Sequence, residues 1–166
     1  MQVTSQPENV VEGLKQYDLF LDVDFKGLTF TGRVKIDMTL PSNKDVNLDA
    51  VGLQVTSVKS GTNLNIPFTQ DSSSVHIHLS KLNLRGGFQY PLEVEYKGKV
   101  SDNFTGLYKA SFGEGYILST HLEAVQARKV LPCIDHPAYK AVFKVSVRTD
   151  ADLSVISNMP VESETK

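Results

Sequence analysis

Hydrophobic and polar side chains alternate over two long stretches near the start of the chain. Every second residue is hydrophobic from 17 to 25, and the same period of two returns from 30 to 40, with Gly32 as the exception. That period is typical of a β-strand that buries one of its two faces. Gly27 separates the two stretches, so we expect them to pair as a hairpin.

Shorter segments of the same kind follow, separated by clusters of Gly, Asn, Ser or Pro at the spacing of turns. They occupy residues 46–48, 54–60, 75–79, 90–96, 116–119 and 141–148. Helical character is confined to one or two short turns near 123–130 and 136–140, because Pro132 ends the first of them. Many short strands without alternating helices predict an all-β fold of antiparallel strands, either a sandwich or a strongly twisted open sheet.

The composition excludes several classes of protein. With 166 residues, the chain has the size of one domain that can bury a core without disulfides or metal ions. Its 40% hydrophobic and 22% charged residues are typical of a folded protein and not of a disordered one. The formal net charge is -2 and no run of Lys or Arg occurs, so neither nucleic acid nor a membrane surface is an expected partner.

The amino end and the single cysteine predict the cellular setting, and the carboxyl end bears on the extent of the protein. Residues 1–15 are polar and acidic, where a signal peptide would need a basic start and an apolar run. Cys133 is the only cysteine, which excludes an internal disulfide, so we expect a reducing, cytoplasmic location. Residues 161–166 stop without a turn or cap, as expected of a chain truncated before a further domain.

The motifs of self-contained enzymes are missing from the sequence. It has no H-E-x-x-H, no G-x-S-x-G, no Walker loop and no paired C-x-x-C, so we expect no catalytic residues and no metal site within the chain. His76 and His78 share one face of a predicted strand, but Val75 and Ile77 on the other face have the character of core residues. The two histidines are therefore expected to face water and not a zinc ion.

The most informative stretch runs from residue 119 to 143. Its residues alone suggest a strand end, a short helical turn, a Pro-Cys loop with a buried Cys133, and a second turn capped by Asp135 or His136. Arg128 is expected to brace this loop through an ion pair with Asp135. A connection this long between two β-strands either has a function or packs against another part of the protein.

The same stretch resembles the T-Q-x-E-A-x-x-A-R-x-x-x-P-C-x-D-x-P-x-x-K-A-x-F signature in the amino-terminal domain of zinc aminopeptidases of the aminopeptidase N family, which are gluzincin metallopeptidases. The residues in register are Ala124, Ala127, Arg128, Pro132, Cys133, Asp135, Pro137, Lys140, Ala141 and Phe143. The similarity extends to 30–32, 106–108 and 157–160, and the variants at 120–123 and 135–137 resemble those of archaeal tricorn-interacting aminopeptidases.

The resemblance implies that residues 1–166 are the amino-terminal β-domain of a larger aminopeptidase that removes amino-terminal residues from peptides. In this family the domain is a saddle of antiparallel strands, and it lies against a thermolysin-like catalytic domain. The expected partners are that missing catalytic domain and a peptide with a free amino terminus. The expected cofactor is zinc, bound in the parent enzyme outside this chain, so the chain alone should be inactive.

The resemblance also implies roles for individual residues. Glu123 matches the carboxylate that holds the α-ammonium group of the substrate together with a glutamate of the catalytic domain, and two carboxylates around one ammonium group select free amino ends. His121 occupies a position where the family usually has Gln, in the wall of the first side-chain pocket. Ala124, Arg128 and Asp135 are expected to support the loop, and the Glu123–Ala124 peptide is expected to be cis.

A second interpretation is open at the level of the sequence, because the fold alone equally permits a free-standing, non-catalytic β-sandwich that serves as a binding or assembly module. The residues themselves also allow Glu123 to be a solvated carboxylate at the start of a short helix. An H-E-x-x-H motif farther along the reading frame would distinguish the two. If the chain is one part of an aminopeptidase, we also expect a broad, exposed face beside residues 119–140 that is apolar or weakly polar.

Overall fold

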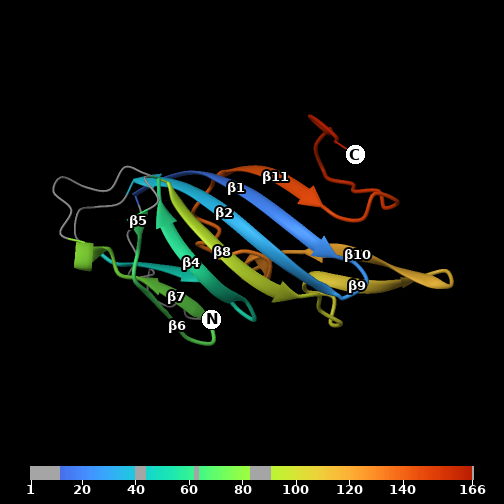
Figure 1. Cartoon of the computed structure of the whole chain (residues 1–166), viewed down its shortest axis with the longest axis horizontal. Helices are drawn as coiled ribbons and strands as arrows, with labels where there is room; N and C mark the ends of the chain where they lie inside the picture. Colours follow the sequence, from blue (N-terminus) through green and yellow to red (C-terminus); the bar gives the residue numbers. More distant parts are fainter. Residues whose placement is uncertain (1–11, 40–43, 62–63, 83–90, 166) are drawn as a thin grey trace.

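Strands form most of the chain that the computed structural model describes, which comprises residues 12–39, 44–61, 64–82 and 91–165 (Figure 1). The elements in chain order are β1 (Glu12–Asp24), β2 (Thr29–Thr39), β3 (Val46–Asp49), β4 (Gln54–Ser60), β5 (Leu64–Asn65), β6 (Phe68–Gln70), β7 (Ser74–Ile77), the 3-10 turn η1 (Leu79–Leu82), β8 (Leu92–Lys99), β9 (Gly106–Phe112), β10 (Gly115–His121), the 3-10 turn η2 (Ala127–Lys129) and β11 (Val142–Arg148). The predicted all-β class is confirmed.

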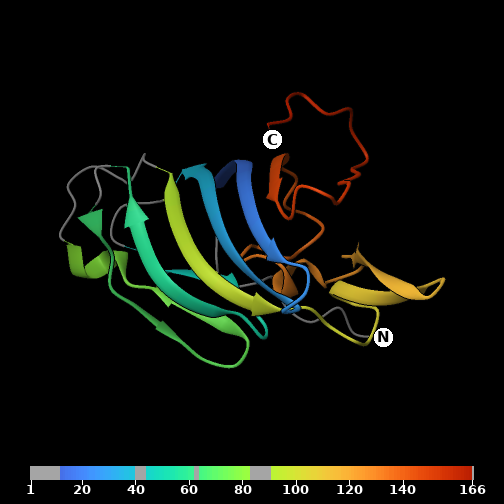
Figure 2. The same cartoon turned by 45° about the vertical axis from the view of Figure 1, so that its right-hand side comes forward.

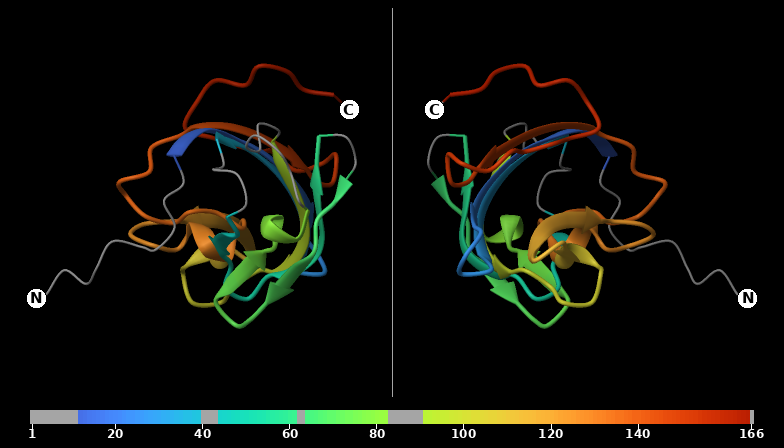
Figure 3. Two further views of the ribbon diagram at one scale, coloured as in Figure 1. Left: turned by 90° about the vertical axis from the view of Figure 1, so that its left-hand side faces the viewer. Right: turned by 90° about the vertical axis from the view of Figure 1, so that its right-hand side faces the viewer.

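The strands form three sheets. The largest has the order β11-β1-β2-β8-β4-β5, a second has the order β3-β7-β6, and β9 pairs with β10 in a hairpin that extends from one end of the molecule (Figure 1). The large sheet is strongly curved, and the three-stranded sheet lies on its concave side (Figures 2 and 3). The predicted twisted, sandwich-like arrangement is therefore confirmed.

One pair of strands departs from the expected antiparallel pattern. Strands β1 and β11 are parallel, with Tyr17 opposite Phe143 and Leu21 opposite Val147. Parallel neighbours require a long connection, and here nearly the whole remaining domain lies between the two strands. Alternation within β11 indicates a strand but not its direction, so the local pattern could not predict this pairing.

The hairpin predicted at the start of the chain is formed by β1 and β2, whose register places Leu19 opposite Val34. The side chains of β2 alternate strictly between exposed and buried positions. In the turn that joins the strands, the Gly27 N–H donates to the Asp24 carboxylate at 2.8 Å. The period of two in the sequence therefore predicted both strands and the face that each of them buries.

Two glycines of the large sheet lie directly under aromatic rings of neighbouring strands. A Cβ atom at Gly32 would be 2.2 Å from Cζ of Tyr96, and one at Gly98 would be 2.2 Å from Cζ of Phe30. The two pairs are directly opposite each other in the β2–β8 register, and the two rings meet edge to face at 6.5 Å. The missing Cβ atoms thus allow both rings to pack flat in a strongly curved sheet.

The hydrophobic core lies between the large sheet and the three-stranded sheet. Val34 and Val94 of the large sheet and Leu48 and Val75 of the small one have no exposed surface. The connection between β10 and β11 contributes to the same core through four buried residues, Val130, Leu131, Pro132 and Cys133. Cys133 is 2% exposed, as expected, and burial raises the pKa of its thiol. The loop with the candidate residues is therefore part of the folded body.

The structure differs from the sequence-based expectations in several short elements. Strands β5, β6 and β9 have no counterpart among the predicted segments. The helix expected over 123–130 is reduced to one 3-10 turn, because the Val130 N–H bonds to the Ala127 carbonyl and Pro132 prevents its extension. Residues 136–140 form a turn without a helix, capped by the Nδ1 atom of His136, which accepts from the Ala138 N–H at 3.2 Å.

Candidate functional site

The candidate residues lie along the connection between β10 and β11. His121 is the last residue of β10 and is opposite Gly106 of β9. The Glu123–Ala124 peptide that follows is cis, as the resemblance implied. The chain then turns, because the Gln126 N–H donates to the Leu122 carbonyl at 3.0 Å, and continues into η2.

Arg128 is the most highly connected side chain of this loop. Its Nε atom is 2.9 Å from Oδ2 of Asp135, and its Nη2 atom is 3.0 Å from the Asp135 carbonyl oxygen. Its Nη1 atom is 3.0 Å from Oδ1 of Asp49. The ion pair expected between Arg128 and Asp135 is therefore formed, and Asp49 joins it as a second carboxylate on the same guanidinium group.

Asp49 connects the loop to the three-stranded sheet, and the sequence analysis did not identify it. The backbone of Asp49 forms a β-bridge with Cys133, with N–O distances of 2.7 and 3.1 Å. Its Oδ2 atom accepts the Asp135 N–H at 3.0 Å. Asp49 is simply the last residue of a four-residue strand in the sequence, so no local signal pointed to these contacts.

Further bonds fix the loop to β1 and to the start of β9. The Tyr17 hydroxyl accepts the Ile134 N–H at 3.0 Å, and burial raises the pKa of this phenol. The Lys129 ammonium group donates to the Thr105 hydroxyl at 2.9 Å. Gly106 lies against the stem of Lys129, where a Cβ atom would approach the Lys129 Cβ to 2.8 Å. The rear of the loop is thus attached to three separate parts of the fold.

The front of the loop is open to solvent. His121, Glu123 and Ala124 are all exposed, and so are the hydrophobic side chains Leu122 and Val125 at 39% and 42%. Within the described part of the chain, neither Glu123 nor His121 forms a hydrogen bond or an ion pair through its side chain. The arrangement therefore presents one carboxylate and one imidazole, without partners, on a loop whose rear is fixed.

His76 of β7 and His78, which follows this strand, both contact other side chains. His76 lies 2.8 Å from Oδ1 of Asn47 and 2.9 Å from Oδ2 of Asp71. His78 lies 3.1 Å from Oδ2 of Asp45 and 3.2 Å from the Thr69 hydroxyl. Across the described ranges, no group of three or more His, Cys, Asp or Glu side chains is placed to hold a metal ion. The described residues therefore do not fit a zinc centre of their own.

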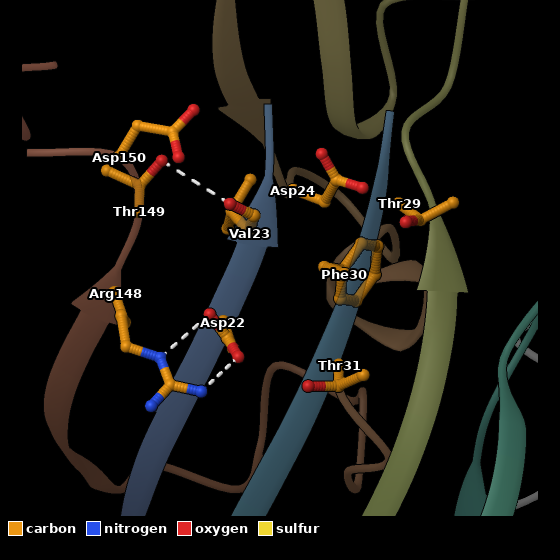
Figure 4. A pocket seen from close by; sticks show the side chains of 9 residues that line it. All are labelled: Asp22, Val23, Asp24, Thr29, Phe30, Thr31, Arg148, Thr149 and Asp150. Carbon is orange, nitrogen blue, oxygen red and sulfur yellow. Dashed lines mark hydrogen bonds and ion pairs between the residues drawn. The ribbon is translucent and has the colours of Figure 1, made fainter. Parts of the chain in front are cut away.

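One hollow of the surface lies between the ends of β1 and β11 and the start of β2 (Figure 4). Two of its charged residues are paired with each other, since the Arg148 guanidinium group forms a two-pronged ion pair with Asp22. The Thr149 hydroxyl donates to the Val23 carbonyl at 3.3 Å. A second hollow, lined by Asn47, Asp49, Arg128, Asp135 and His136 among others, lies beside the rear of the loop.

None of the helical segments in the described parts of the chain has the length and apolar character needed to cross a lipid bilayer.

Comparison with known families and relatives gives a consistent result. The model of the Peptidase M1 N-terminal domain matches residues 14–166. "Probable aminopeptidase 2" of Sulfurisphaera tokodaii is 45% identical over 150 residues, and "Tricorn protease-interacting factor F2" of Thermoplasma acidophilum is 36% identical over 151 residues. The matches cover 90% and 89% of this chain but only 18% of each relative, so the chain spans a small part of their length.

The fold is also found among solved structures. An M1 zinc metallopeptidase from Deinococcus radiodurans, bound to a Tyr-Ser-Ala substrate, superposes with a TM-score of 0.62 at 22% identity. The superposition covers 83% of this chain and 32% of that one. The similarity therefore concerns the architecture of one part of a larger protein.

Proposed function

The chain belongs to the Peptidase M1 N-terminal domain family, and on that premise we propose that residues 1–166 are the amino-terminal β-domain of a zinc-dependent aminopeptidase, which removes amino-terminal residues from peptides. In this proposal the chain helps to recognise the free amino terminus of the substrate and forms part of the first side-chain pocket. The observation that carries it is the exposed and unpaired Glu123 carboxylate on a loop that is fixed from behind.

Glu123 would bind the α-ammonium group of the peptide. A carboxylate without a protein partner is free to accept charge-assisted hydrogen bonds from an ammonium group, and these are among the strongest in proteins. A fixed loop contributes further, because a carboxylate that is already in position loses little freedom when the substrate binds. Glu123 would thereby select peptides with a free amino end over blocked ones.

His121 would line the pocket for the first side chain of the substrate. It is exposed at the end of β10, two residues before Glu123 in the sequence. An imidazole differs from the Gln amide usual at this position in shape and in its pattern of donors and acceptors. This substitution would therefore change which substrate side chains the peptidase prefers.

The reacting groups would be supplied by a catalytic part outside this chain. The described residues offer no set of three metal ligands, and the relatives are far longer than the chain. Zinc bound in that catalytic part would polarise the scissile carbonyl group and activate a water molecule. The residues of this chain would contribute only to binding and orientation of the peptide.

An exposed apolar strip on β11 supports the existence of such a covering part. Phe143, Val145 and Val147 are 52%, 49% and 37% exposed, and they extend the same sheet face that β1 buries in the core. Leu122 and Val125 add exposed apolar surface beside Glu123. Apolar surface that continues from a core is usually an interface, and we place the catalytic part against it.

We also propose a cytoplasmic location for the protein. Cys133 is buried and unpaired, and the raised pKa of its thiol makes it poorly reactive. The fold therefore requires no oxidising compartment.

The test is a substitution in the complete peptidase that contains this domain. Glu123→Ala should lower kcat/KM for aminoacyl-naphthylamides, because one charged partner of the ammonium group is lost. The decrease should correspond to a loss of about 2 to 3 kcal/mol in transition-state stabilisation. The zinc content should stay unchanged. Glu114→Ala, at an exposed position of the β9–β10 turn, is the matched control. An unaltered kcat/KM in the Glu123 variant would remove this residue from the site.

A further inference from the structure

We propose that Asp49 is a positioning residue for substrate recognition, which holds Glu123 in place by tying Arg128 to the three-stranded sheet. This inference rests on the proposed function of Glu123. It assigns a role to a residue that lies far from the motif in the sequence and does not itself reach the substrate.

The guanidinium group of Arg128 is held by two aspartate residues. All three of its nitrogen atoms are engaged, Nε and Nη2 by Asp135 and Nη1 by Asp49. A guanidinium group held at every nitrogen has one orientation, since its planar fork fits the three acceptors only in that position. The side chain of Arg128 is therefore fixed in rotation as well as in place.

The two aspartates that bind Arg128 contribute differently to its position. Asp135 belongs to the same connection as Arg128, so their contact closes the loop on itself and does not tie the Arg128 side chain to another part of the fold. Asp49 ends β3, which Leu48 anchors in the core with no exposed surface. Among the described residues, only Asp49 links the Arg128 side chain to a rigid sheet.

A short stretch of hydrogen-bonded backbone connects Arg128 to Glu123. The Arg128 carbonyl accepts the Val51 N–H at 2.9 Å, two residues beyond Asp49 in the sequence. The turn before it is closed by the bonds Gln126 N–H to Leu122 carbonyl at 3.0 Å and Lys129 N–H to Gln126 carbonyl at 3.1 Å. A displacement of Arg128 is therefore transmitted through one short, hydrogen-bonded turn to the peptide that carries Glu123.

Burial gives this link its strength. The side chains of Arg128, Asp49 and Asp135 are 24%, 32% and 9% exposed, so solvent screens the cluster less than a surface ion pair. Asp49 also accepts the Asp135 N–H, and its backbone pairs with Cys133. Removal of the Asp49 carboxylate leaves the backbone bridge in place, so the variant should fold while the front of the loop loosens.

The chain offers a matched control in Asp45, which lies just before the same strand. Its carboxylate also accepts one backbone N–H, from Ser80 at 3.0 Å, and contacts the side chains of Ser80 and, at 3.1 Å, His78. Within the described ranges, none of its bonds reaches residues 119–135. Asp49→Ala and Asp45→Ala thus remove similar interactions from the same sheet, and only the first touches the loop.

The experiment measures kcat/KM and hydrogen exchange in the complete peptidase. Asp49→Ala should lower kcat/KM for free-amino substrates about 10- to 100-fold, the range expected for displacement of a binding group by about 1 Å. Exchange of the amides of residues 122–129 should accelerate and the zinc content should not change. Asp49→Asn, which keeps an acceptor for the Asp135 N–H but loses the charge, should have an intermediate effect, and Asp45→Ala should leave kcat/KM unchanged.

A double-mutant cycle with Glu123→Ala separates the two proposals. If Asp49 acts through Glu123, Asp49→Ala should cause no further loss of kcat/KM once Glu123 is alanine. The positioning role would be overturned if the losses of kcat/KM in Asp49→Ala and Glu123→Ala multiply in the double variant. It would also be overturned if Asp45→Ala causes a loss of the same size as Asp49→Ala, or if exchange at residues 122–129 is unaltered in Asp49→Ala. A large effect of Glu123→Ala beside no effect of Asp49→Ala would overturn this inference and leave the proposed function intact. No effect of Glu123→Ala would contradict the proposed function itself.

Discussion

The rings of Tyr17 and Phe143 stack with their centroids 4.9 Å apart, and this contact joins β1 to its neighbour β11, the first and last strands in chain order. The same Tyr17 accepts the Ile134 N–H through its hydroxyl group. One side chain therefore fixes the rear of the candidate loop and the strand that follows it. The loop and β11 are built onto the same edge of the sheet, where the exposed apolar strip begins.

The chain alone should neither bind zinc nor hydrolyse peptides. It carries no H-E-x-x-H motif, and its described residues form no set of three ligands. Metal analysis of the purified chain and an assay with aminoacyl-naphthylamides check this together. Turnover that copurifies with the chain and is lost in Glu123→Ala would contradict it.

Arg128→Ala should destabilise the chain by about 2 to 4 kcal/mol, because it leaves the Asp49 and Asp135 carboxylates facing each other in a partly buried site. Arg148→Ala is the comparison, since Arg148 also pairs with an aspartate but its side chain is 68% exposed. That substitution should cost much less, because solvent screens the exposed pair. Urea denaturation at neutral pH gives both values, and equal losses would show that the Arg128 cluster is not a structural anchor.

Acid should weaken the three-stranded sheet through Asp45. The Ser80 N–H, and then the Ser80 hydroxyl and His78, lower the pKa of this carboxyl group to about 2. A carboxyl group whose pKa is lower in the folded state stabilises the fold above its unfolded value of about 4. Its contribution should be lost as the pH falls from about 4 to about 2. Asp45→Asn should flatten the pH dependence of unfolding in that window, and an unchanged slope would contradict the assignment.

The chain by itself should associate through the apolar strip on β11. Val145→Lys places a charge in the middle of the strip, at a side chain that is 49% exposed, and should shift the chain towards the monomer. Ser111→Lys, on the exposed end of β9, is the control and should not change association. Sedimentation over a range of concentrations measures the effect. A wild-type chain that stays monomeric at high concentration would contradict the proposal that a catalytic part covers this strip.

The sequence predicted those parts of the fold in which one residue type repeats at a fixed spacing. The hydrophobic residues of strand β2 alternate with polar ones except at Gly32, and both the extent and the buried face of the strand follow from this period of two. Strand β9 was missed because its residues change from buried to exposed along the strand, so no alternation develops. The parallel pairing of β11 was missed because strand direction depends on the whole chain path.

The candidate site was predicted through its motif and not through its contacts. The motif identified Arg128, Asp135 and Glu123, which all lie in one continuous stretch. Asp49 was missed because its contacts join distant positions and form only after the three-stranded sheet has packed against the loop. A polar residue at the end of a short strand has no local pattern that would reveal such a role.

Recognition of the substrate's ammonium group by Glu123 is tested most directly by a pair of inhibitors. Two zinc-binding hydroxamates that differ only in the presence of an α-amino group are compared on the complete peptidase, and the ratio of their inhibition constants is the quantity measured. Glu123→Gln keeps the size of the side chain and removes its charge, and it should lower the preference for the amino compound by at least about tenfold. Glu114→Gln should leave the ratio unchanged. A Glu123→Gln enzyme with the wild-type preference would contradict the proposed role of this domain.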